Sequence, residues 1–71
     1  MVHEAKPFVP NRLVQARERA GMPASALARV VRVTRQTIKN YEDGVTAPTT
    51  ERVQSLASAL NEDEAFFYAP P

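Results

Sequence analysis

Apolar residues recur every three or four positions along most of this chain, which is the spacing of helices that bury one face. The pattern falls into four sets, within residues 11–20, 24–31, 35–43 and 50–60. The repeating apolar positions are Leu13, Val14, Ala16, Ala20, Leu27, Ala28, Val31, Ile38, Tyr41, Val53, Leu56, Ala57 and Leu60. The strict alternation of a half-buried strand appears nowhere. The sequence therefore predicts an all-α protein with short helices.

Residues that start or stop helices lie at the edges of these sets. Pro10 suits a first helical position, where its missing N–H costs no hydrogen bond. Gly21 and Gly44 are placed to end the first and third helices, because glycine readily adopts a positive φ. Thr34 and Thr49 carry side-chain oxygens that can cap the third and fourth helices. Caps and periodicity thus predict the same boundaries.

The two ends of the chain differ from this helical centre. Residues 1–9 lack periodicity and predict an extended arm. Residues 62–67 predict a final helical turn that places Phe66 or Phe67 on the core. We therefore expect a compact bundle of five short helices over residues 10–69, preceded by the arm.

Composition narrows the functional classes. The chain has 71 residues, 44% of them hydrophobic, and no cysteine, so it can build one small core but no disulfide or thiolate metal site. His3 is the only histidine and lies in the arm, so we expect no metal and no cofactor. No histidine, cysteine or carboxylate pair is arranged near a nucleophile, which predicts that the protein is not an enzyme. No apolar run approaches the roughly 20 residues of a membrane helix, so we expect a soluble, cytoplasmic protein.

The net charge of +1 is unevenly distributed along the chain. Residues 1–23 carry four basic and two acidic side chains, whereas residues 41–71 carry one basic and six acidic ones. Between them, residues 24–40 carry four basic side chains and no acidic one. This asymmetry is typical of a polyanion-binding face on a domain kept near neutrality. Charge alone leaves open the alternative of a solvated helix face.

The second and third predicted helices are joined by a short turn at residues 32–34. Such a turn makes the two helices cross steeply and exposes the N-terminal half of the third helix. An α-helix is about 10–12 Å across and fits the major groove of B-DNA, which is about 12 Å wide. The exposed side chains of residues 35–43 therefore decide whether DNA is a plausible ligand.

These side chains are of the types that distinguish base pairs. Arg35 can donate two hydrogen bonds to guanine, and Gln36 and Asn40 can each pair with the N6 and N7 atoms of adenine. Thr37 offers a hydroxyl and a methyl group that can meet the methyl group of thymine. Lys39 adds a cation on the same side. The third helix is therefore predicted to be a recognition helix that lies in the major groove.

At this point the sequence resembles a known family. The segments "LVQARERAGM", "ALARVVRVTRQTIKNYEDG" and "VQSLASAL" are similar to the phage-repressor-like helix-turn-helix proteins, also called the xenobiotic-response-element family of bacterial regulators. The tail "DEAFFYAPP" resembles the end of this module in regulators where a longer C-terminal domain follows. The resemblance implies a lambda-repressor-like fold and transcriptional regulation by a repressor or antitoxin-like protein. It also implies a homodimer on an inverted-repeat operator.

The resemblance implies roles for individual residues. The base-reading positions are Arg35, Gln36, Thr37, Lys39 and Asn40. The phosphate-contacting positions that we expect are Arg12, Ala24, Arg29, Arg32 and Thr34. Arg17 and Glu42 match the paired arginine and glutamate that tie the first helix to the third, and we expect this pair to be partly buried.

The sequence also departs from the family pattern. Pro23 and Ala24 stand where a Ser or Thr cap and a Gln usually contact phosphate. Arg32 stands where the turn usually has glycine, so the backbone must adopt a costly conformation or a different turn. Asp43 and Val45 occupy a loop that usually carries basic side chains. Because phosphate contacts supply most non-specific affinity, these changes predict weakened DNA binding or greater dependence on the remaining basic residues.

Two functional classes therefore remain open. In the first, the chain binds double-stranded DNA as a regulator, alone or as the DNA-reading part of a longer protein. In the second, it keeps the fold but grips a protein partner, with little or no DNA binding. The aromatic residues 66–68 allow either core packing or a dimer contact.

Overall fold

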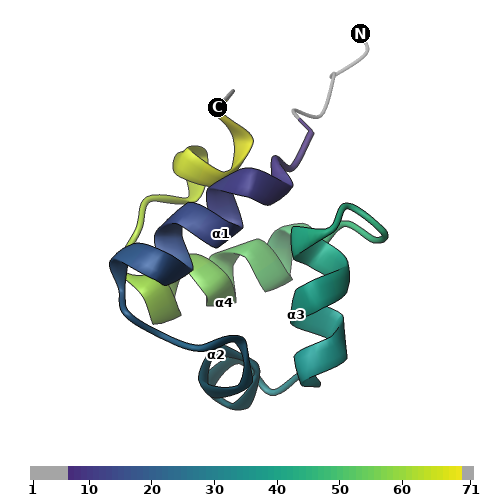
Figure 1. Ribbon diagram of the computed structural model, residues 1–71. Coiled ribbons are helices and arrows are strands. Elements are labelled where there is room, and N and C mark those ends of the chain that lie inside the picture. Colours follow the sequence, from purple (N-terminus) through teal and green to yellow (C-terminus); the bar gives the residue numbers. More distant parts are fainter. Residues whose placement is uncertain (1–6, 70–71) are drawn as a thin grey trace, which may run out of the picture.

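The computed structural model describes residues 7–69, which form four α-helices and one 3-10 helix (Figure 1). Within that range no β-strand is present. Most of the expected arm, residues 1–6, lies outside the described residues. The elements are α1 (Pro10–Arg19), α2 (Ala24–Val31), α3 (Arg35–Glu42), α4 (Thr50–Leu60) and η1 (Glu64–Tyr68).

The predicted all-α fold is confirmed, with corrections at helix ends. The first helix begins at Pro10 as expected but ends at Arg19, and the third ends at Glu42 with Asp43 as its C-cap. The predicted final helical turn is a 3-10 helix, which begins when the Asp63 carboxylate accepts a hydrogen bond from the N–H of Ala65. It spans five residues, a length at which 3-10 geometry usually stops.

The expected caps explain why the third and fourth helices begin where they do. The Thr34 side chain accepts a hydrogen bond from the N–H of Thr37 at 3.0 Å, and the Thr49 side chain accepts one from the N–H of Arg52 at 3.1 Å. In contrast, α2 follows Pro23 and receives no side-chain cap. The beginning of α2 therefore relies on backbone hydrogen bonds, in which the Pro23 carbonyl accepts from the N–H groups of Ala26 and Leu27.

A single hydrophobic core joins all five elements. Its largest fully buried side chains are Leu13, Leu27, Ile38, Val53, Leu56 and Phe67. Phe67 brings η1 into the core and stacks on Phe8 with ring centroids 6.2 Å apart, while the N–H of Val9 donates to the carbonyl of Phe67 at 2.8 Å. The segment before α1 is thus held against the end of the chain, and the aromatic tail packs as core.

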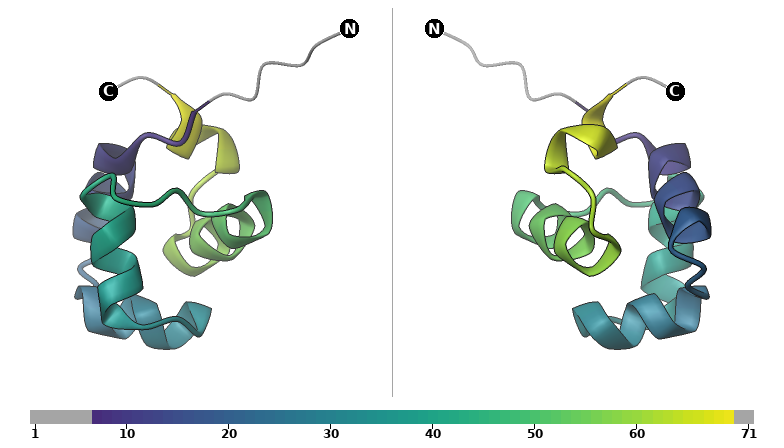
Figure 2. Two further views of the ribbon diagram at one scale, coloured as in Figure 1. Left: turned by 90° about the vertical axis from the view of Figure 1, so that its right-hand side faces the viewer. Right: turned by 90° about the vertical axis from the view of Figure 1, so that its left-hand side faces the viewer.

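The helices are arranged so that α2 and α3 meet at a corner of the molecule. In Figure 1, α2 lies at the bottom, α3 rises at the right, and α4 lies behind both. The turned view in Figure 2 shows α3 along one side of the molecule, with α2 below it and η1 at the opposite end beside α1. The packing of α2 against α3 and α4, and of α1 against α3, leaves one long face of α3 uncovered.

The turn between α2 and α3 depends on a left-handed residue. Arg32 is the C-cap of α2 and has φ 62° and ψ 48°, a conformation that glycine adopts without strain. Its position is stabilised nearby, because the Arg52 guanidinium donates to the carbonyl of Val31 at 2.9 Å, and the N–H of Val33 donates to the carbonyl of Ala28. Of the two expected alternatives, the chain therefore uses the costly conformation.

Replacing Arg32 with glycine is expected to stabilise the protein relative to Arg32→Ala. Both variants lose the same charge, but only alanine keeps the Cβ that clashes with the carbonyl in the left-handed region, at a cost of about 1–2 kcal/mol. The greater freedom of glycine in the unfolded chain offsets part of this gain, leaving about 0.5–1 kcal/mol. Urea unfolding followed by circular dichroism measures the difference. Equal midpoints for the two variants would show that the turn stores no strain.

Candidate nucleic-acid interface

One face of α3 is buried and the other is open to solvent. Ile38 and Tyr41 point into the core, as the periodicity predicted. On the opposite side Arg35 and Gln36 are exposed and Asn40 is half-buried. Figure 2 shows α3 at one side of the molecule, where no other element crosses its outer surface.

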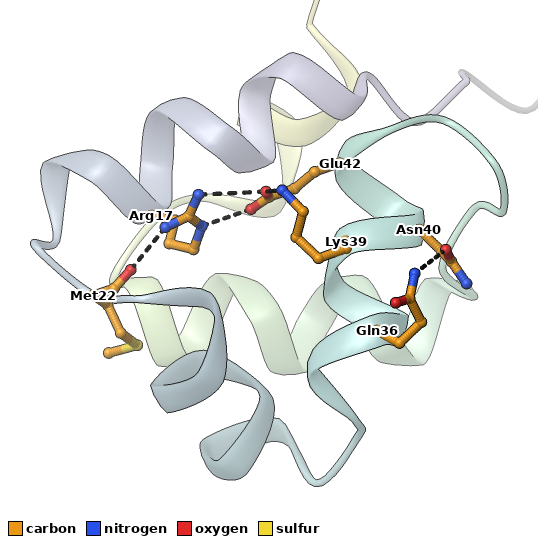
Figure 3. A network of polar contacts seen from close by, with 6 residues as sticks. All are labelled: Arg17, Met22, Gln36, Lys39, Asn40 and Glu42. Carbon is orange, nitrogen blue, oxygen red and sulfur yellow. Dashed lines mark hydrogen bonds and ion pairs between the residues drawn. The ribbon is translucent and has the colours of Figure 1, made fainter.

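The outward side chains of α3 differ in how firmly they are held. The amide nitrogen of Gln36 donates to the amide oxygen of Asn40 at 2.9 Å, which Figure 3 shows on the outer side of the helix. The hydroxyl of Thr37 lies 2.8 Å from that of Thr34 and thereby joins the helix cap. Arg35 forms no hydrogen bond or ion pair with the residues the structure describes. The face therefore combines one free arginine with a linked pair of amides.

Lys39 lies on the inner rim of this face and not at its centre. Its ammonium nitrogen is 3.8 Å from the Oε1 atom of Glu42, and its side chain stays partly exposed. The carboxylate thus draws Lys39 toward α1 (Figure 3). Of the five expected base-reading residues, Arg35 and Gln36 are exposed and Asn40 is half-buried beside Gln36, whereas Thr37 and Lys39 contact the helix cap and Glu42.

The Arg17–Glu42 pair joins α1 to α3 in the expected way. The Nε atom of Arg17 donates to Glu42 Oε2 at 2.6 Å, and its NH2 atom donates to Oε1 at 3.3 Å. A third donor, NH1, bonds the carbonyl of Met22 at 3.2 Å, in the segment leading to α2 (Figure 3). The Glu42 side chain is 3% exposed and that of Arg17 is 18% exposed, so the pair is largely removed from water. One guanidinium therefore links α1, α3 and the start of α2.

The fold and the site geometry agree with a comparison to protein families. A helix-turn-helix family model, HTH_3, matches residues 13–67. The chain belongs to this family. It is a helix-turn-helix domain of the kind typical of DNA-binding transcriptional regulators, with α2 and α3 as the helix pair.

Solved structures share this fold. An HTH_3 family transcriptional regulator from Vibrio cholerae superposes with a TM-score of 0.76 at 25% identity, over 84% of this chain and 34% of the regulator. The DNA-binding domain of the P22 C2 repressor gives 0.80 at 22% identity, over 90% of this chain and 84% of that domain. Hydroxypropylphosphonic acid epoxidase from S. wedmorenis gives 0.80 at 23% identity, over 93% of this chain and 37% of the enzyme.

This chain therefore spans about a third of the length of the Vibrio regulator and of the epoxidase, and most of the P22 domain. No curated protein matches the sequence. Within residues 7–69, no helix is long and apolar enough to cross a membrane. In the same range, no three His, Cys, Asp or Glu side chains gather where they could hold a metal ion.

The expected phosphate-contacting residues lie in different parts of the helix-turn-helix domain. Arg29 and Arg32 are exposed at the C-terminal end of α2, and Thr34 is exposed in the turn. Ala24 begins α2, where backbone N–H groups and the helix dipole favour an anion. All four positions precede α3 in the sequence, and Arg32 and Thr34 lie in the turn that leads into it.

Arg12 is separated from that group and is already engaged. Its Nε atom donates to the carbonyl of Ala69 at 3.3 Å, its NH1 atom donates to Gln15 at 3.3 Å, and its guanidinium lies 4.6 Å from the centre of the Phe66 ring. Arg19 covers the same ring at 5.0 Å. The guanidinium of Arg12 thus holds η1 against α1, and its phosphate contact stays a prediction that this packing disfavours.

Two contacts of this domain were not anticipated from the sequence. Arg19 pairs with Glu62 at 3.1 Å between α1 and the segment before η1, and Gln36 is linked to Asn40. The second had a sequence signal, because residues four apart on a helix are neighbours and Gln–Asn pairs at that spacing form hydrogen bonds. The first had none, since the two residues are 43 positions apart.

Glu42→Gln is expected to lower the free energy of unfolding by about 3 kcal/mol. Removing one member of a buried pair leaves the other charge without compensation, and the low end of the usual range applies because Arg17 keeps some exposure. Glu62→Gln is the matched control: its partner Arg19 is 61% exposed, so about 1 kcal/mol or less is expected. Thermal unfolding of the two variants and the parent measures this. Equal losses would contradict a special role for the Arg17–Glu42 pair.

Proposed function

We propose that this helix-turn-helix domain binds double-stranded DNA sequence-specifically and acts as a transcriptional regulator, with α3 in the major groove. The observation that carries the proposal is the open side of α3, which bears the exposed Arg35 and Gln36 and the half-buried Asn40. Arginine and amide side chains are the commonest readers of guanine and adenine. They belong to a stretch, residues 24–40, that holds no acidic side chain.

The phosphates on either side of the groove would be held mainly by α2 and the turn. Arg29 and Arg32 supply exposed cations, Thr34 supplies a hydroxyl, and the N-terminus of α2 at Ala24 supplies backbone N–H groups. Lys39 is half-exposed and reaches the edge of the groove while Glu42 restrains it. Because these phosphate contacts are few, we expect base contacts to contribute a larger share of the affinity for DNA than in domains with many phosphate contacts.

The proposed regulator binds as a homodimer to an inverted-repeat operator in the cytoplasm. Helix-turn-helix domains of this type bind as dimers and read two half-sites about one helical turn apart. Each subunit places one recognition helix in the major groove, and the groove returns to the same side of the duplex after one turn. The similar Vibrio cholerae protein is a transcriptional regulator, which supports the regulatory role, and its greater length allows a further domain beside the DNA-reading one. We infer no enzymatic role for residues 10–69, the unit that we propose as the DNA-binding domain, although the fold also occurs within an epoxidase chain.

The second candidate is a protein-interaction domain. It is favoured by the start of α2, where Pro23 provides no side-chain cap, and by the absence of basic residues from the loop at 43–48. Both features remove contacts that would otherwise hold DNA phosphates. A protein partner would then cover the outward face of α3.

Selection of duplexes from a random-sequence DNA pool tests the proposal. At moderate salt, we expect an inverted repeat to be recovered, and log K should fall linearly with log salt with a slope of about −0.9 for each phosphate contacted. A pool that stays random, or a complex that ignores salt, would instead favour the protein-interaction domain.

Arg35→Ala is expected to weaken binding to the selected duplex by about 1–3 kcal/mol and to relax the preference at one base pair. The physical reason is the loss of a two-bond contact to guanine, and titration of labelled duplexes with each base at that position measures it. Arg19→Ala removes an equal charge from α1, away from α3, and should leave the preference unchanged. A uniform loss over all duplexes would make Arg35 a phosphate contact.

A further inference from the structure

We propose that Gln36 and Asn40 act as one unit in which Asn40 orients the Gln36 amide so that it selects adenine over guanine. This inference rests on the proposed function and names a specificity-determining pair within it. The observation is the hydrogen bond from the Gln36 amide nitrogen to the Asn40 amide oxygen, 2.9 Å long and formed in the absence of DNA (Figure 3).

The two ends of this hydrogen bond are held unequally. Asn40 is half-buried, and its backbone carbonyl accepts hydrogen bonds from the N–H groups of Val45 at 2.9 Å and Thr46 at 3.4 Å, which fix the end of α3. Gln36 is exposed, and its long side chain has more rotatable bonds. Asn40 is therefore the anchored partner and Gln36 the oriented one.

Counting hydrogens shows what the oriented amide can do. The Gln36 amide nitrogen has two hydrogens, and one of them is donated to Asn40. The second hydrogen and the amide oxygen remain, so the side chain presents one donor and one acceptor. Adenine presents one acceptor, N7, and one donor, the N6 amino group, in the major groove. The oriented amide matches this pattern with both of its remaining groups.

Guanine requires a different arrangement. Its major groove edge presents two acceptors, N7 and O6, so a glutamine must give both amide hydrogens to bind it with two bonds. In this protein that would break the hydrogen bond to Asn40. The Gln36–Asn40 bond thus favours adenine twice, by pre-orienting the amide and by penalising the guanine mode.

The test compares base preferences of the full chain and three variants on the selected duplex. The position read by Gln36 is the one whose preference disappears in Gln36→Ala, and duplexes carrying each base there are titrated. The wild type should prefer adenine to guanine by about fivefold or more. Asn40→Ala should reduce that ratio by about two- to tenfold, the worth of one hydrogen bond.

Asn40→Asp is the matched control. It keeps an oxygen that can accept the hydrogen bond from Gln36 but lacks the amide donors, so it should retain the adenine-to-guanine ratio while its charge weakens binding to all duplexes. Circular dichroism melting shows that each variant is folded, which we expect because neither side chain belongs to the buried core. These outcomes separate orientation of Gln36 from direct base contact by Asn40.

Contrary results are distinguishable from failure of the proposed function. An unchanged ratio in Asn40→Ala, the same loss in Asn40→Asp as in Asn40→Ala, or a base other than adenine at the Gln36 position would overturn the paired reading alone. A wild-type protein that selects no sequence would overturn both the paired reading and DNA recognition by α3.

Discussion

The position of α3 on the rest of the domain depends on the Arg17–Glu42 pair. One guanidinium bonds the Glu42 carboxylate on α3 through two donors and the Met22 carbonyl before α2 through a third. Because a nearly buried charge is costly without a partner, other placements of α3 relative to α1 are disfavoured. The pair adds direction to a core whose apolar contacts are non-directional, and so it holds the outward face of α3 at a defined angle to α2.

The turn between α2 and α3 places a second constraint on that angle, and here the sequence was informative only in part. The sequence left two alternatives at Arg32, a left-handed residue or a different turn. The identity of the residue shows that the left-handed conformation is costly, but not whether surrounding contacts stabilise it. The structure resolves this through contacts from distant residues, among them the bond from Arg52 on α4 to the carbonyl of Val31. Tertiary packing of this kind is absent from local sequence patterns.

The same contrast between local sequence patterns and tertiary packing explains what could be predicted elsewhere. Helix positions followed from periodicity and from the Thr34 and Thr49 caps, which act within three residues. The final helical turn was predicted but not its 3-10 geometry, which begins at the Asp63 cap and carries the buried Phe67. On α3, the side-chain types indicated base reading, but their hydrogen bonds to each other and to neighbouring groups depend on rotamers. Arg12 shows the limit: its charge suggested phosphate, and its position beside Phe66 gives it a packing role.

These features bear on the proposed DNA binding, for which we expect few phosphate contacts. Phosphate contacts add affinity without sequence information, whereas base contacts supply the discrimination. Pro23 and Ala24 stand at the start of α2, and the loop at 43–48 has no basic residues. The affinity supplied by phosphate contacts is therefore expected to be reduced. Side chains that are ordered before binding lose less conformational entropy when they meet the bases. If α3 reads DNA as proposed, an amide pair already bonded on a helix fixed by a largely buried ion pair favours selection of sequence over general attraction.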